Sequence, residues 1–161
     1  MQIFILGKSK SGKTTLSQKF LAKQCAIYEA GAWARKEYSQ LKNHVKETDK
    51  AYREKLTEYA LSQLQKDNQY SIKQYDLFLK QCQNNIKVIV GIRNPEDFIE
   101  ILKRDKDNKI IWVDHNKENQ ESSEFDEGLD VIEKYVSWKN KMGLSQIEVI
   151  VDVESFVKGI I

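Results

Sequence analysis

Eight residues near the start of the chain have the types and the spacing of a phosphate-binding loop. The run Gly7-Lys8-Ser9-Lys10-Ser11-Gly12-Lys13-Thr14 fits the pattern G-x-x-x-x-G-K-[ST] without a mismatch. The two glycines let the backbone approach phosphates closely, and successive N–H groups then point at the anion. Lys13 is expected to reach the β- and γ-phosphates, and the Thr14 hydroxyl is expected to bind Mg²⁺. The pattern predicts that this loop, together with the adjoining Thr15, binds a nucleoside triphosphate.

The arginines are the next candidates, because a guanidinium grips phosphate through two parallel hydrogen bonds. The chain has only four, at Arg35, Arg53, Arg93 and Arg104. Arg93 follows a predicted strand, and ligands of open parallel sheets bind at the carboxyl ends of strands. A phosphate-binding role for Arg93 is therefore favoured over a surface ion pair with the acids that follow it. For Arg35 the two roles are equally favoured, whereas Arg53 and Arg104 are expected to be surface residues.

Short apolar segments alternate with amphipathic ones along the chain, and these must position the candidate residues. Strands are predicted at residues 3–6, 87–90, 109–113 and 147–153. Helices are predicted at residues 14–24, 28–41, 48–65, 71–82 and 125–142, with Gly143 ending the last. A further helix begins at Asn94-Pro95, where Asn94 is a capping residue and Pro95 suits the first turn. The alternation predicts a single α/β domain, residues 1–161, with a mainly parallel sheet.

Composition narrows the function classes. With 26 basic and 24 acidic residues the net charge is +2, which argues against a protein that coats nucleic acid. No apolar run approaches the length that a membrane span needs. Cys25 and Cys82 lack a C-x-x-C spacing, so both are expected to be reduced thiols, as in a cytoplasmic protein.

Three segments resemble nucleoside monophosphate kinases, especially the deoxynucleoside monophosphate kinases found in phages. The first is the phosphate loop with its flanking strand and helix. The second, Ala30-Gly31-Ala32-Trp33-Ala34-Arg35, resembles the T-G-D-x-x-R segment by which adenylate kinases hold the acceptor phosphate. The third, Val90-Gly91-Ile92-Arg93-Asn94-Pro95, resembles the G-F-P-R of adenylate kinases and the V-R-N-P of the phage-type enzymes.

The resemblance implies a three-layer P-loop fold with a five-stranded sheet of order 2-3-1-4-5. A helical acceptor-binding insert would span residues 30–83, and a short lid would span residues 115–123. The implied activity is phosphoryl transfer from ATP, with Mg²⁺, to a nucleoside or deoxynucleoside monophosphate, by a monomer or homodimer. Lys13, Arg35 and Arg93 would be the catalytic residues.

The chain departs from this family at two places. The expected lid has no arginine to stabilise the transferring phosphoryl group, and Lys117 is its only basic residue. Where many relatives carry an acid before the strand-end glycine, this chain has Val90. Asp114, after the strand at residues 109–113, is either a ligand of Mg²⁺ through water or a cap of the following loop.

Two alternatives therefore stay open. One is a P-loop kinase for another small acceptor. The other is a nucleotide-binding protein without kinase activity, including a guanine-dependent switch. Asn116-Lys117-Glu118-Asn119 partly matches the guanine-reading N-K-x-D motif, but its last position is not Asp and no D-x-x-G element precedes it.

Overall fold

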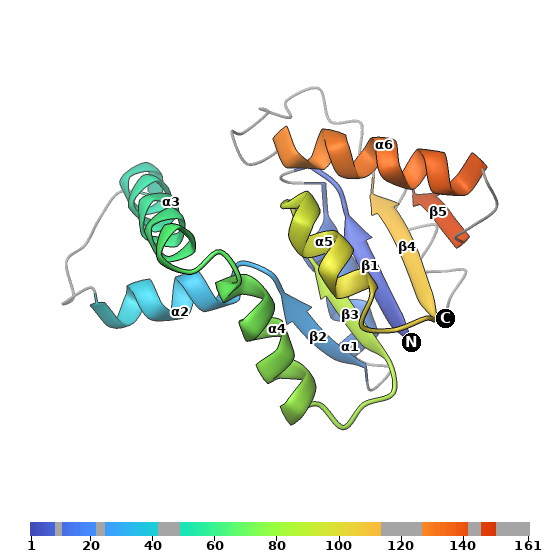
Figure 1. Cartoon of the computed structure of the whole chain (residues 1–161), viewed down its shortest axis with the longest axis horizontal. Coiled ribbons are helices and arrows are strands. Elements are labelled where there is room, and N and C mark those ends of the chain that lie inside the picture. Colours follow the sequence, from blue (N-terminus) through green and yellow to red (C-terminus); the bar gives the residue numbers. More distant parts are fainter. Residues whose placement is uncertain (9–10, 22–24, 42–48, 114–126, 142–145, 151–161) are drawn as a thin grey trace.

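The computed structural model describes residues 1–8, 11–21, 25–41, 49–113, 127–141 and 146–150 (Figure 1). The elements follow in the order β1 (Gln2–Leu6), α1 (Lys13–Leu21), β2 (Ala26–Glu29), α2 (Ala32–Leu41), α3 (Asp49–Lys66), α4 (Tyr70–Gln81), β3 (Lys87–Val90), α5 (Pro95–Leu102), β4 (Asn108–Val113), α6 (Glu127–Lys141) and β5 (Gln146–Ile150).

One sheet contains all of these strands in the order β2-β3-β1-β4-β5, and every pairing is parallel. The predicted α/β class and parallel sheet are thus confirmed, and the order is the one that the resemblance implies. β1 lies at the centre, and each of its residues is buried, as expected for a strand covered on both faces. Because all strands run the same way, the segments that follow β1, β2, β3 and β4 start from one edge, called here the carboxyl edge.

Helices cover both faces of the sheet, because successive side chains of a strand point to opposite faces. Ile3 and Ile5 of β1 join a cluster with Leu16 and Phe20 of α1 on one face. On the other face, a second cluster contains buried residues from α4, α5 and α6, with Phe4 of β1 packed edge-on against Phe98. The result is a three-layer molecule, with α5 and α6 in front of the strands in Figure 1.

The predicted helix at residues 28–41 is wrong at its start. Tyr28 and Glu29 end the strand β2, and the helix α2 begins only at Ala32. β2 is a short edge strand in which only Tyr28 is buried, so it has no continuous buried apolar run to distinguish it from the start of a helix. The other predicted elements match the observed ones to within a residue at the ends that the structure describes.

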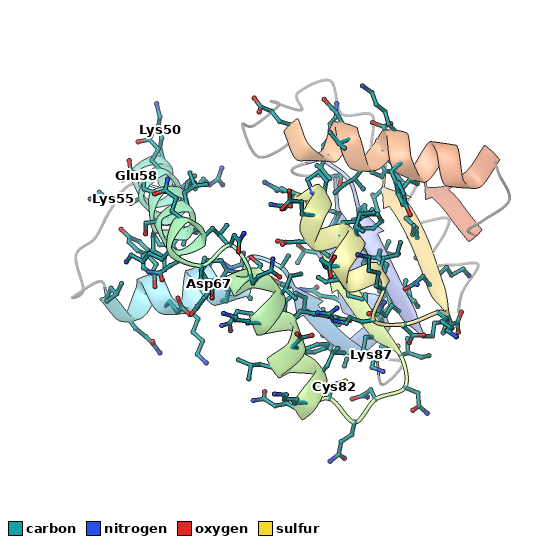
Figure 2. All side chains as sticks on the ribbon, in the orientation of Figure 1. Lys50, Lys55, Glu58, Asp67, Cys82 and Lys87 are labelled. Atoms are coloured by element: carbon teal, nitrogen blue, oxygen red, sulfur yellow. The ribbon has the colours of Figure 1, made fainter. Side chains whose placement is uncertain are left out.

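The helices α2 and α3 form an arm that extends away from the sheet (Figure 1). None of the residues of α3 is buried, and Figure 2 shows Lys50, Lys55 and Glu58 projecting from it. A carboxylate on α2 bonds to both of the helices that follow it. Glu37 accepts hydrogen bonds from the Tyr59 hydroxyl of α3 at 2.8 Å and from the Tyr70 hydroxyl of α4.

Cys25 and Cys82 are both free thiols. Burial raises the pKa of the Cys25 thiol, which keeps it protonated and unreactive. None of the helices in the described ranges has the length and apolar character needed to cross a bilayer.

A buried polar network links the first strand to the helices in front of it. The Tyr75 hydroxyl donates to Gln2 Oε1 at 2.5 Å, and Gln2 Nε2 donates to the Ile101 carbonyl at 3.1 Å and to Asn108 Oδ1 at 2.7 Å. Both Gln2 and Tyr75 are almost completely buried, so water cannot replace a lost partner.

Tyr75→Phe is expected to destabilise the protein by about 1–3 kcal/mol, because it leaves the Gln2 amide oxygen buried without its donor. Tyr59→Phe is the matched control, since that hydroxyl is partly exposed and water can hydrate Glu37 in its place. Urea unfolding of both variants measures the difference. Equal stabilities for the two variants would contradict the assigned role of the buried network.

Candidate functional site

The glycine-rich loop connects β1 to α1 at the carboxyl edge. Gly7 has φ +145° and Gly12 has φ +93°, in the region that favours glycine. A Cβ on Gly7 would overlap the Val113 carbonyl oxygen and would lie 2.9 Å from Ser11 Oγ. The loop therefore passes tightly against the end of β4. Ser9 and Lys10 lie outside the described residues.

Lys13 opens α1 and is almost completely buried, with 8% of its surface exposed. Its ammonium group donates to the Lys8 backbone carbonyl and to Ser11 Oγ, the latter at 3.3 Å. A buried cation at the N-terminus of a helix attracts an anion through its own charge and through the helix dipole. Together with a backbone that tolerates no side chain at Gly7, this arrangement fits a bound polyphosphate.

The two threonines that follow occupy the first turn of α1. Both Thr14 and Thr15 are exposed, so the Thr14 hydroxyl is accessible to a ligand. The second expected metal ligand, Asp114, lies outside the described residues. Its predecessor Val113 ends β4, and the Val113 carbonyl carbon would be 3.3 Å from a Cβ on Gly7. The chain therefore leaves β4 directly beside the loop.

Arg93 lies in a turn fixed from three sides. Gly91, with φ +80°, turns the chain after β3. Asn94 then caps α5, because its side chain accepts hydrogen bonds from the backbone N–H groups of the first turn. The third constraint is Gly128 in the first turn of α6, which packs so closely that any Cβ there would overlap the Arg93 carbonyl oxygen.

Arg35 lies on α2 and forms an ion pair with Glu29, the last residue of β2, at 2.5 Å. The register pairs Glu29 with Val90 of β3. Arg35 is thus tied to the carboxyl edge one strand away from Arg93. Both partners are about half exposed, so the pair adds little stability. Sequence reasoning missed Glu29; its signal was an acid at a strand end six residues before an arginine.

The other two arginines lie where the sequence predicted, on the surface. Arg53 is exposed on α3. Arg104 follows α5 at the opposite edge of the sheet and pairs with Asp76 of α4 at 3.1 Å. The order β2-β3-β1 therefore brings the surroundings of Arg35, Arg93 and the loop together at one edge, whereas Arg104 lies at the other edge. The expected lid at residues 115–123, with Lys117, lies outside the described residues.

Asp97 is a second residue that sequence reasoning missed, having treated it only as a helix-start acid. It lies in the first turn of α5, where burial raises the pKa of its carboxyl group to about 6, although a hydrogen bond with the Ser71 side chain opposes the shift. An acidic residue whose pKa is raised by burial, and which lies near the carboxyl edge of the sheet, is a candidate functional residue.

No family model matches the chain, and no curated protein matches it. Among solved structures, it is similar to a shikimate kinase from Aquifex aeolicus, with 19% identity, a TM-score of 0.44, and coverage of 99% of this chain and 93% of the other. It is also similar to a sugar kinase from Janibacter sp., with 12% identity, a TM-score of 0.46, and coverage of 99% of this chain and 91% of the other. A shikimate kinase from Bacteroides thetaiotaomicron has 17% identity and a TM-score of 0.43, with coverage of 99% of this chain and 96% of the other. At these identities and TM-scores the similarities assign no activity, so function is argued from the residues of this chain alone.

Proposed function

We propose that the protein transfers the γ-phosphoryl group of ATP to a nucleoside or deoxynucleoside monophosphate. The observation that carries the proposal is the arrangement of the carboxyl edge. A glycine-rich loop with a buried lysine follows β1. Arg93 follows β3, the strand beside β1, and Arg35 follows β2, the strand on the other side of β3. One strong anion site flanked by two guanidinium groups suits a reaction between two phosphates.

The donor end of the site consists of the loop. The backbone N–H groups of residues 7–15 and the Lys13 ammonium would hold the triphosphate, and Thr14 and Asp114 would hold Mg²⁺. When bound, the metal ion neutralises charge on the phosphate oxygens. Lys13 is already positioned by Lys8 and Ser11, so little reorganisation is needed before the phosphoryl group moves.

The acceptor end consists of Arg93 and Arg35, which would hold the acceptor phosphate in line with the donor. In the step itself, the bond from the γ-phosphorus to the leaving oxygen of ADP breaks, and a bond to an acceptor phosphate oxygen forms. That oxygen is already anionic, so the step requires positioning and charge neutralisation more than proton transfer.

Arg93→Ala and Arg35→Ala are each expected to lower phosphoryl transfer by roughly 10²–10³-fold, because each removes a charged donor from the transition state. The measurement is ADP formation with a panel of nucleoside and deoxynucleoside monophosphates. Arg53→Ala, which removes an exposed arginine from α3, is the matched control and should retain activity. Unchanged transfer to every acceptor in the Arg93→Ala variant would exclude the assignment.

One observation favours a different acceptor. The Glu29 carboxylate lies beside Arg35 at the end of β2, and a carboxylate there can accept the proton of an attacking hydroxyl group. This arrangement suits a kinase for a small hydroxylated acid or sugar. The same assay with polyols and hydroxy acids in the panel separates the two candidates, because only this one predicts a hydroxyl acceptor and a large loss of activity in Glu29→Gln.

A further inference from the structure

Tyr70, the first residue of α4, contacts α2 in two ways. Its hydroxyl donates to Glu37 Oε1 at 2.5 Å, and its ring packs edge-on against Trp33, with ring centroids 5.0 Å apart. Trp33 and Glu37 are four residues apart, so they lie on the same face of α2. The hydrogen bond with Glu37 raises the pKa of Tyr70 to about 12, which keeps its hydroxyl a donor at neutral pH. One tyrosine side chain thus contacts two successive turns of α2.

The position of Tyr70 is fixed by its own helix and by the turn before it. α4 contributes Ile72 and Tyr75 to one of the two core clusters. Asp67 fixes the turn between α3 and α4 (Figure 2). Its backbone carbonyl accepts from the Tyr70 N–H at 3.0 Å, and its carboxylate accepts from the Gln69 N–H at 3.0 Å. Tyr70 therefore belongs to a segment that the core holds in place.

α2 has little burial of its own to hold it against the sheet. Among residues 32–41 only Ala34 is buried. Arg35 pairs with Glu29, but both side chains are about half exposed, so this ion pair adds little stability. The neighbouring helix α3 has no buried residue. The contacts with Tyr70 matter because they link α2 to a helix of the core.

Arg35 lies on the opposite side of α2 from the face that Tyr70 contacts. It is two residues from Trp33 and two from Glu37, and two residues correspond to about 200° around a helix. Tyr70 is thus on one side of α2, and the Arg35 guanidinium is on the other, beside the end of β2. A rotation of α2 would carry the guanidinium away from this place. A displacement of about 1 Å at a substrate contact can lower a rate by roughly 10²-fold.

We propose that Tyr70 is a positioning residue for Arg35. By holding Trp33 and Glu37 it fixes the rotation of α2, and with it the place where the Arg35 guanidinium meets the acceptor phosphate. The inference rests on the proposed function, and Tyr70 needs no contact with the substrate. Tyr59 of α3 is the matched comparison, because its hydroxyl donates to the other oxygen of the same carboxylate at 2.8 Å. Only Tyr70 connects that carboxylate to a helix of the core.

The kinetic test uses the nucleoside monophosphate that the acceptor panel identifies. Tyr70→Phe keeps the ring and removes the hydroxyl, and should lower kcat/KM for this acceptor about tenfold while the KM for ATP stays near the wild-type value. Tyr59→Phe should stay within about twofold of the wild type. In an Arg35→Ala background, Tyr70→Phe should have less than about a twofold further effect, because Tyr70 acts through Arg35.

Three results would overturn the inference. The first is an equal loss from Tyr70→Phe with and without Arg35. The second is a rise in the KM for ATP as large as the rise for the acceptor, and the third is an equal loss in Tyr59→Phe and Tyr70→Phe. Each would make Tyr70 a residue that supports the whole fold.

Hydrogen exchange of the unliganded protein separates this inference from the proposed function, because it needs no chemistry. Backbone amides of residues 35–38 should exchange severalfold faster in Tyr70→Phe than in Tyr59→Phe, while those of α1 keep their wild-type rates. That result would support the positioning of Arg35 by Tyr70 even if the wild type phosphorylated no acceptor. Unchanged exchange at residues 35–38, with wild-type phosphoryl transfer by Tyr70→Phe, would refute Tyr70 and keep the kinase.

Discussion

Replacing Lys13 with methionine is expected to lower ATP-dependent phosphoryl transfer by roughly 10²–10³-fold or more. The ammonium group lies at the N-terminus of α1, buried and already bonded to the Lys8 carbonyl and Ser11 Oγ. Its charge is thus held in place before ATP arrives, and it would stabilise the negative charge that develops on the transferring group. Methionine keeps an unbranched stem in the buried space and removes only the charge.

The measurement is single-turnover transfer from labelled ATP, with circular dichroism to verify folding. Lys19→Met is the matched control, because Lys19 is exposed on the same helix and should be dispensable. ATP binding should also weaken in Lys13→Met. A variant that folds and transfers phosphoryl groups at the wild-type rate would contradict the role of the loop as the donor site.

Gly128→Ala is expected to have the second large effect, because it acts on Arg93 from a distant part of the sequence. The added methyl group would overlap the Arg93 carbonyl oxygen and would lie 3.2 Å from Pro95 Cδ. Both contacts are with backbone or a proline ring, so neither can rotate away. The turn at residues 91–94 or the start of α6 must shift, at a cost of about 1–3 kcal/mol.

The shift should change acceptor kinetics more than donor kinetics. The KM for the acceptor is expected to rise severalfold while the KM for ATP stays close to its wild-type value, because the atoms nearest to a Cβ on Gly128 belong to Arg93 and Pro95. Glu133→Ala, at an exposed position on the same helix, is the control. Equal effects on both KM values would mean that Gly128 supports the whole fold and not Arg93 in particular.

The features that sequence predicted are those that depend on local pattern. The loop is a continuous motif, β1 is a continuous apolar run, and α5 begins with a capping asparagine and a proline, as observed. These signals need no partner elsewhere in the chain. The proposed donor site could therefore be predicted from residues 7–15 alone.

The features that sequence missed depend on contacts between distant segments. β2 is a strand because it pairs with β3, although its own four residues lack a strand pattern. Asp97 has the residue type and position of an ordinary helix-start acid, and only the approach of Ser71 and Tyr28 buries it. Glu29 likewise becomes a candidate site residue only because the fold pairs it with Arg35.

The arm formed by α2 and α3 has a consequence for how this protein can change over generations. No residue of α3 belongs to either core cluster, and the hydroxyl of Tyr59 joins that helix to Glu37 of α2. Substitutions on the outer surface of α3 therefore leave the packing of the sheet intact. Natural variation or laboratory selection can therefore remodel this side of the molecule without altering the glycine-rich loop after β1.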